Sequence, residues 1–323
     1  MKTNKPILLV TATLEFMPDL KIEIQKKFKL IYKNQASYLD TMKILNKFKV
    51  EAWICNPCPT YEINSLLISK CKSLKVVATP STGINHFSKE IFQIKNLKIF
   101  SLKDSTLLKS IKASSEYTFI FMASFIRKIN EGLVSVKKDK WRDYEKNLRG
   151  RELNSLTLGI FGYGRIGSNL AKYSNAFGMK IFAFDPYVKK FHRFVTKIDV
   201  IETMLAKIDI LAICATLNDS TVNFFNNKIF KKCKKGIIIV NTSRGEIINE
   251  KDLIKNIKNK RISGCALDVV SNENKKNFTS ELINFSKKDE RLYITPHIAG
   301  LTYDSEKKAQ NIAFNFIKNY FKI

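Results

Sequence analysis

The sequence predicts an α/β fold with two open parallel sheets. Apolar runs of strand length alternate with stretches of helical periodicity along almost the whole chain, and this alternation is typical of parallel sheets. Of the 323 residues, 45% are apolar, which is enough for a sizeable core in about two domains. Neither a low-complexity linker nor a short repeat interrupts the pattern.

The first half of the chain carries the first series of strands and helices. Asp19–Phe28 and Tyr38–Phe48 are helix-like stretches that lie between strand-like runs. A longer helix is predicted to start near Ser114, and the polar stretch from Lys137 to Arg151 is expected to form an exposed arm. The five strand candidates of this half are Ile7–Val10, Leu30–Tyr32, Ala52–Cys55, Val76–Ala78 and Lys98–Phe100.

The second half continues the alternation with a longer series of strands. The last helix is predicted from Asp304 onward, because Ala309, Ile312 and Phe316 then share one face. The six strand candidates of this half are Thr157–Phe161, Ile181–Asp185, Ile210–Cys214, Ile237–Asn241, Gly264–Asp268 and Leu292–Thr295.

The composition excludes several classes of protein. The longest apolar runs are only strand-sized, so no membrane span is predicted. The N-terminus lacks a cleavage signature for secretion, and we expect a cytoplasmic protein. The net charge is +27, but the 47 Lys and 9 Arg are scattered over the chain, whereas nucleic-acid surfaces gather Arg on one face. We therefore expect no specific nucleic-acid partner and no membrane partner.

The cysteines give little support for a metal or redox site. Six are present, and only Cys55 and Cys58 have the C-x-x-C spacing. A closed zinc site needs a second pair of ligands, and no second pair of this kind follows. We predict reduced thiols and no metal site, and a role for Cys55 and Cys58 stays open.

A glycine-rich turn predicts a dinucleotide site. The strand Thr157–Phe161 runs into Gly162-Tyr163-Gly164-Arg165-Ile166-Gly167, and a helical segment follows. These glycines permit a tight turn and the close approach of a pyrophosphate to the helix N-terminus. Asp185 ends the next strand, where a carboxylate meets the ribose hydroxyls. This carboxylate repels a 2′-phosphate, so NAD is favoured over NADP, although Lys189 and Lys190 follow closely in the sequence.

Polar and ionisable residues also end the other predicted strands of the second half, where ligands bind in an open parallel sheet. Four stretches there resemble the D-isomer-specific 2-hydroxyacid dehydrogenase family, and most of all its phosphoglycerate dehydrogenase-like branch. The first half is similar to the family only through Ser81–His86 and Ser114–Glu116. The four stretches are Leu158–Gly167, Asn241–Glu246, Ala266–Val269 and Thr295–Gly300.

The resemblance implies an NAD-dependent oxidoreductase that interconverts a small 2-oxo acid and its D-2-hydroxy acid. It implies a catalytic triad in which Arg244 holds the substrate carboxylate, His297 transfers the proton and Glu273 orients the imidazole. These roles suit the rigid cationic fork of arginine, the imidazole of histidine, which titrates near neutral pH, and the supporting carboxylate of glutamate. The residues that the family would use to bind the cofactor are Gly162, Gly164, Arg165, Ile166, Gly167, Asp185, Ala215, Thr216, Thr242, Ser243, Arg244, Asp268, His297 and Gly300.

The resemblance also implies two Rossmann/flavodoxin-like domains with an interdomain cleft. Residues 1–109 and 298–323 are expected to form the substrate-binding (catalytic) domain, and residues 110–297 the NAD-binding domain. The loop Ser81-Thr82-Gly83 is expected to bind the substrate together with Arg244 and His297. Relatives suggest a homodimer through the long helix and the arm.

Departures from the family leave the substrate open. Phosphoglycerate-specific relatives carry an Arg near the strand end occupied here by Cys55-Asn56-Pro57, and no Arg precedes Arg127. A lysine does not replace its bidentate contact with phosphate. The substrate is therefore a small 2-hydroxy acid, with 3-phosphoglycerate as an open alternative. The other reading left open is a dinucleotide-sensing binding protein without turnover, similar to the corepressors related to this family; the intact triad argues against it.

Overall fold

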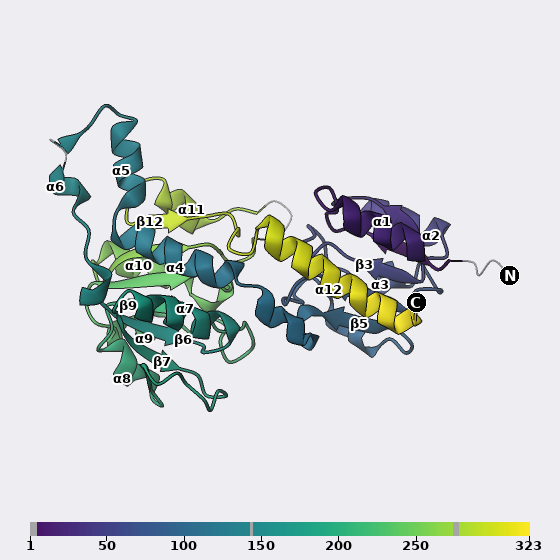
Figure 1. The fold of residues 1–323 in the computed structure, drawn as a ribbon. Coiled ribbons are helices and arrows are strands. Elements are labelled where there is room, and N and C mark those ends of the chain that lie inside the picture. Colours follow the sequence, from purple (N-terminus) through teal and green to yellow (C-terminus); the bar gives the residue numbers. More distant parts are fainter. Residues whose placement is uncertain (1–4, 143–144, 274–277) are drawn as a thin grey trace. The chain divides into compact units, whose positions relative to one another are not determined.

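The computed structural model of the chain describes residues 5–142, 145–273 and 278–323 (Figure 1). Contacts between residues divide it into two units. Unit 1 holds the chain up to Ile111 together with Leu301–Ile323, and unit 2 holds Lys112–Glu273 and Thr279–Gly300. No helix in these described ranges is long and apolar enough to cross a membrane.

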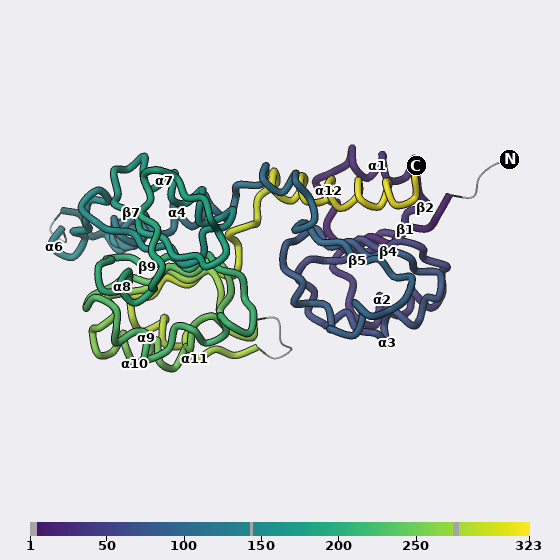
Figure 2. The backbone as a smooth tube through the Cα atoms, turned by 90° about the horizontal axis from the view of Figure 1, so that it is seen from below, coloured from purple at the N-terminus to yellow at the C-terminus, as the bar shows by residue number. Residues whose placement is uncertain are grey.

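Unit 1 is a five-stranded parallel sheet with the strand order β2-β1-β3-β4-β5. Figure 2 shows α1 and α12 on one face of this sheet and α2 and α3 on the other. The C-terminal helix α12 therefore completes the unit that the N-terminal strands begin, and it packs Ile312 and Phe314 into the same core as Leu8. The elements are β1 (Ile7–Val10), α1 (Pro18–Lys27), β2 (Lys29–Tyr32), α2 (Tyr38–Lys47), β3 (Ala52–Ile54), α3 (Ser65–Ile68), β4 (Val76–Thr79), β5 (Lys98–Ser101) and α12 (Tyr303–Phe321).

Unit 2 is a seven-stranded parallel sheet with the strand order β12-β11-β10-β9-β6-β7-β8. In Figure 2, α4 and α7 cover one face and α9, α10 and α11 the other. The elements are α4 (Ala113–Ile126), α5 (Ile129–Val136), α6 (Glu145–Leu148), β6 (Thr157–Phe161), α7 (Arg165–Ala176), β7 (Lys180–Phe184), β8 (Val195–Lys197), α8 (Ile201–Leu205), β9 (Ile210–Ile213), α9 (Asn227–Lys232), β10 (Ile237–Asn241), α10 (Glu250–Lys258), β11 (Ile262–Leu267), α11 (Glu281–Ser286) and β12 (Leu292–Ile294).

The predicted fold class is confirmed, since both series of strands form parallel sheets. Most of these strands are buried on both faces, and such strands read as nearly continuous apolar runs, which made them visible in the sequence. Strand β8 was not predicted. It lies at the edge of the sheet, pairs only with β7 and buries only Val195 of its three residues, so it has no apolar pattern.

Local side chains fix where several helices begin. Ser37 caps α2 by accepting a hydrogen bond from the Asp40 N–H at 3.1 Å, and the Asp40 carboxylate accepts one from the Ser37 N–H. Thr302 caps α12 in the same way through the Ser305 N–H, at 3.0 Å. Helix α12 therefore starts three residues after unit 2 ends, where the chain returns to unit 1.

Candidate active site

The predicted site residues of unit 2 follow the ends of six strands. All seven strands run parallel, so their carboxyl ends share one edge of the sheet. The chain order reverses between β6 and β9, and dinucleotides bind open sheets at such a point. In chain order the site residues are Gly162 after β6, Asp185 after β7, Ala215 and Thr216 after β9, Thr242, Ser243 and Arg244 after β10, Asp268 after β11 and His297 after β12.

The glycine turn after β6 leaves room for a phosphate group. Gly162 has φ +93°, and a Cβ atom there would lie 2.6 Å from the backbone nitrogen of Ala215. A Cβ on Gly167 would lie 2.1 Å from the carbonyl oxygen of Gly162, so these two glycines let the turn, α7 and the β9 loop pack closely. A Cβ on Gly164 would meet nothing within 4 Å. Gly164 is the N-cap of α7, and the open space lies at the helix N-terminus, where unpaired N–H groups attract anions.

Asp185 ties the glycine turn to the strand beside it. Its Oδ2 accepts a hydrogen bond from the Tyr163 N–H at 2.7 Å, and its Oδ1 accepts from the Tyr187 and Val188 N–H groups at 2.9 and 3.1 Å. Three backbone donors thus fix the carboxylate beside the turn. The residues around the turn fit a dinucleotide whose pyrophosphate lies near Gly164 and whose ribose meets Asp185.

His192 also lies at this turn, which sequence reasoning missed. The Tyr163 hydroxyl and His192 Nδ1 are 2.7 Å apart, and the Tyr163 ring stacks on Phe191 at 4.4 Å. No motif surrounds His192 in the sequence, so it is not indicated as a site residue. A contact across 29 residues leaves no signal in local spacing.

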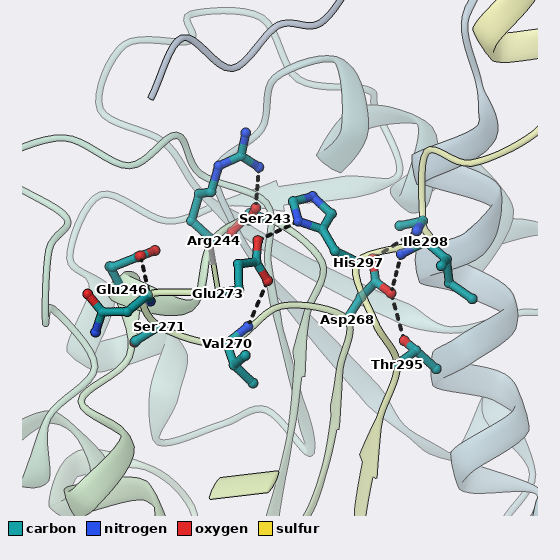
Figure 3. A network of polar contacts seen from close by, with 12 residues as sticks. Ser243, Arg244, Glu246, Asp268, Val270, Ser271, Glu273, Thr295, His297 and Ile298 are labelled. Carbon is teal, nitrogen blue, oxygen red and sulfur yellow. Dashed lines mark hydrogen bonds and ion pairs between the residues drawn. The ribbon is translucent and has the colours of Figure 1, made fainter. Parts of the chain in front are cut away.

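His297 and Glu273 form the central pair of the site. The Nδ1 atom of His297 lies 2.5 Å from Oε1 of Glu273, and the second ring nitrogen points away from this carboxylate (Figure 3). The His297 side chain is 32% exposed and that of Glu273 is 17% exposed. The carboxylate is therefore shielded while the ring can be reached by a ligand. A histidine held through Nδ1 presents Nε2 for proton transfer.

Asp268 holds the turn that carries His297. Its carboxylate is fully buried and accepts hydrogen bonds from the Thr295 hydroxyl at 2.7 Å, the Ile298 N–H at 2.9 Å and the Ala299 N–H at 2.8 Å. Burial raises the pKa of Asp268, and these three donors oppose that rise. His297 has φ +55°, a conformation that non-glycine residues rarely adopt. The Asp268 network stabilises this strained turn, as expected where a side chain must point in one direction.

The loop after β10 positions Arg244. Its guanidinium donates to the Ser243 carbonyl oxygen at 2.6 Å, and the Asn241 amide donates to the Arg244 carbonyl oxygen at 2.9 Å. A Cβ on Gly245 would lie 2.1 Å from the backbone of Val270, so only glycine lets this loop approach the loop that carries Glu273. Figure 3 shows the Arg244 guanidinium and the His297 ring rising to the same side of that loop. A cationic fork and a proton donor therefore face one region, which suits an α-oxo carboxylate.

The remaining predicted cofactor and substrate residues lie in several different places in the fold. Thr242 is buried, and its hydroxyl lies 2.6 Å from that of Thr118 on α4, a partner that the sequence did not indicate. Ala215 lines the glycine turn, whereas Thr216 and Gly300 are exposed. Ser81, Thr82 and Gly83 belong to unit 1, where the Ser81 hydroxyl donates to the Gly83 carbonyl oxygen at 2.7 Å.

The cysteines are free thiols. Cys55 is buried and Cys58 is exposed. Burial raises the pKa of Cys55 to about 12, which disfavours the reactive thiolate. The Cys55 sulfur lies 3.8 Å from His86 Nε2 in unit 1.

Comparison with known proteins identifies relatives of the chain. Residues 119–299 match the family model described as D-isomer specific 2-hydroxyacid dehydrogenase, NAD binding domain. A hydroxypyruvate reductase of Thermotoga maritima is 29% identical over 261 residues, which cover 81% of each chain. A D-3-phosphoglycerate dehydrogenase of Methanocaldococcus jannaschii is also 29% identical, over 79% of this chain but only 47% of that relative.

A solved structure shows the same fold over almost the whole chain. The D-lactate dehydrogenase from Aquifex aeolicus, complexed with NAD and lactic acid, has a TM-score of 0.81 and 24% sequence identity. The match covers 98% of this chain and 95% of that structure. At this identity the likeness establishes the two-sheet fold of both units.

Proposed function

The chain belongs to the D-isomer-specific 2-hydroxyacid dehydrogenase family, and from this premise we propose that it reduces a small 2-oxo acid to the D-2-hydroxy acid with NADH. It is an NAD-dependent oxidoreductase, in keeping with the NAD-binding domain that its residues 119–299 match. The observation that carries the proposed reaction is the pair His297–Glu273 beside Arg244. Hydroxypyruvate, the substrate named for one relative, is a reasonable first candidate.

The roles of the three residues follow from their contacts. Arg244 would bind the substrate carboxylate through two parallel N–H···O bonds, which fixes the neighbouring carbonyl group. His297 would donate the proton from Nε2 to the carbonyl oxygen, while Glu273 holds the ring at Nδ1. When bound, the reduced cofactor supplies the hydride. This direction requires the protonated ring, whose Nδ1–H would donate to Glu273 while Nε2 delivers the proton.

The cofactor would lie along the carboxyl edge of unit 2. Gly164 leaves space for the pyrophosphate, and Gly162, Arg165, Ile166 and Gly167 complete the turn. Asp185 would accept hydrogen bonds from the ribose and disfavour NADP. Asp268 would act on the cofactor side mainly by holding the His297 turn, since its carboxylate is fully buried and bonds to that turn.

We assign the substrate-binding role to unit 1, including its loop Ser81-Thr82-Gly83, and the NAD-binding role to unit 2. The boundaries expected from the family, 1–109 with 298–323 and 110–297, lie close to the division of the chain at Ile111 and Leu301. A cytoplasmic location is proposed with it, because the six cysteines are free thiols, as is usual in a reducing compartment.

A homodimer through the long helix and the arm, Ser114–Arg151, a segment that includes α5, is also proposed. Ile129, Leu133 and Val136 recur at helical spacing on α5 and are each more than half exposed, and Trp141 in the arm is 70% exposed. Apolar side chains gathered in this way usually mark a surface that another chain covers. Light scattering would show a dimer in the wild type and a monomer in Leu133→Asp; a monomeric wild type would contradict this proposal.

A screen of 2-oxo acids with NADH tests the proposed reaction. The absorbance of the reduced nicotinamide should fall with at least one short 2-oxo acid, and the product should be the D enantiomer. Retained NADH binding without turnover of any 2-oxo acid would instead favour the cofactor-sensing alternative.

A further inference from the structure

Three segments of unit 1 form a rim without Lys or Arg. They are Thr11–Met17 after β1, Cys55–Asn64 after β3 and Thr79–Ser88 at the end of β4, and we call them the rim. The three strands are neighbours in a parallel sheet, so the rim lies along its carboxyl edge, where ligands of open sheets bind. The proposed function makes this edge the substrate side of unit 1.

Hydrogen bonds join the three segments into one surface. The Thr11 hydroxyl oxygen accepts from the Asn56 N–H at 3.0 Å, which ties the first segment to the second. The Ile63 N–H donates to the His86 carbonyl oxygen at 2.8 Å, and the Ser88 N–H donates to that of Ile63 at 3.0 Å. Residues of all three segments therefore keep fixed positions relative to one another.

The charge of the rim contrasts with that of the chain. The sequence holds 56 Lys and Arg among 323 residues, so a stretch of ten residues has on average one or two. The rim has none, its one histidine is His86, and it carries two carboxylates, Glu15 and Glu62. Lys33 and Lys103 follow the two outer strands of the sheet, β2 and β5, and both are exposed.

The helices that leave the rim offer no replacement for a cation. Helix α1 starts with Pro18, which has no N–H, and Asp19 follows in its first turn. The N-terminus of α3 is occupied because the Asn64 side chain accepts a hydrogen bond from the Leu67 N–H at 3.0 Å. A helix N-terminus that already faces a carboxylate or a cap is a poor site for a further anion.

The rim does offer neutral hydrogen-bonding groups. Asn56 uses its Oδ1 to accept from the Cys58 N–H at 2.9 Å, and its Nδ2 has no partner among the described residues. The Thr82 hydroxyl likewise has no hydrogen-bond partner among the described residues. Such groups can bind a hydroxyl on a substrate, but they cannot balance two negative charges.

From these observations we infer that the enzyme selects 2-oxo acids with an uncharged side chain and discriminates against phosphorylated ones. A phosphate monoester carries about −1.5 to −2 charge at neutral pH and binds where Arg or Lys neutralises it. On the rim it would meet Glu15 and Glu62 instead. The inference rests on the proposed function, because it concerns the substrate of that reaction.

The test compares hydroxypyruvate with its 3-phosphate ester, using NADH and the wild-type chain. We expect kcat/KM to be roughly 10–100-fold lower for the ester, the usual effect of losing charge-assisted hydrogen bonds. Equal or better use of the ester would overturn the inference and leave the proposed function standing. Failure to reduce either compound, or any other 2-oxo acid, would remove the proposed function and the inference with it.

A pair of variants tests the position of the charge. Asn56→Arg adds a cation to the rim, and we expect it to raise kcat/KM for the ester by about 10-fold relative to hydroxypyruvate. Asn46→Arg is the matched control, because Asn46 is exposed in the last turn of α2, toward the opposite edge of the sheet. An equal response of the two variants would show that overall charge, and not the rim, sets the preference.

Discussion

Nδ1 of His297 lies 2.5 Å from Oε1 of Glu273, although the two residues come from different loops at the carboxyl edge of unit 2. This contact assigns the two ring nitrogens: Nδ1 is engaged by the carboxylate, and Nε2 is left for a substrate. The buried Asp268 network fixes the turn that carries the ring.

Replacement of Glu273 by Gln should lower turnover more than cofactor affinity. The substitution keeps the size of the side chain, but an amide can turn its nitrogen or its oxygen toward Nδ1 and holds the ring less firmly in the orientation that presents Nε2. We expect kcat to fall by about 10-fold or more, while NADH affinity stays close to the wild-type value. Steady-state kinetics with a parallel NADH titration check this, and an unchanged kcat would show that Glu273 only shapes the loop.

Arg244→Lys should impair binding and rate together. Lysine keeps the positive charge but loses the planar fork that fits a carboxylate at two points. We expect KM for the 2-oxo acid to rise about 10-fold or more, together with a lower kcat, while NADH affinity stays close to the wild-type value. Steady-state kinetics with a parallel NADH titration check this. Unchanged KM would place the carboxylate elsewhere.

NADH should bind more tightly than NADPH, by about 10-fold or more. Asp185 is held by three backbone N–H groups, so its carboxylate cannot easily turn away from a 2′-phosphate. Fluorescence titration of both cofactors measures the difference. If NADPH bound equally well, Lys189→Ala and Lys190→Ala would show whether a lysine neutralises the phosphate.

Replacement of Gly164 and of Gly245 by alanine should have different effects on stability and on NADH binding. A Cβ on Gly164 meets open space, so Gly164→Ala should change the free energy of unfolding by less than about 1 kcal/mol and still weaken NADH binding. A Cβ on Gly245 collides with the Val270 backbone, so Gly245→Ala should cost roughly 1–3 kcal/mol of stability. Denaturant unfolding and NADH titration separate the two effects. Unaltered NADH affinity in Gly164→Ala would argue against a pyrophosphate at this turn.

The sequence predicted the strands and the ends of the strands well, because buried parallel strands are apolar along their whole length. It also supplied Gly162, Asp185 and His297 as candidates, since each follows such a strand within a short motif. It could not show that Asp268 holds the His297 turn or that His192 contacts Tyr163. These contacts join residues roughly 30 positions apart, and a single sequence carries no signal of that pairing. Strand β8 escaped prediction for a related reason, because an exposed edge strand lacks an apolar pattern.

Turnover of a 2-oxo acid by His297→Ala tests the central claim most directly. With a substrate identified by the screen, kcat should fall by roughly 10²–10⁴, the usual contribution of a positioned proton donor. NADH affinity and thermal stability, measured on the same sample, should remain close to the wild-type values. Turnover within a few-fold of the wild type would mean that the proton comes from another group and that His297 does not have the role assigned to it.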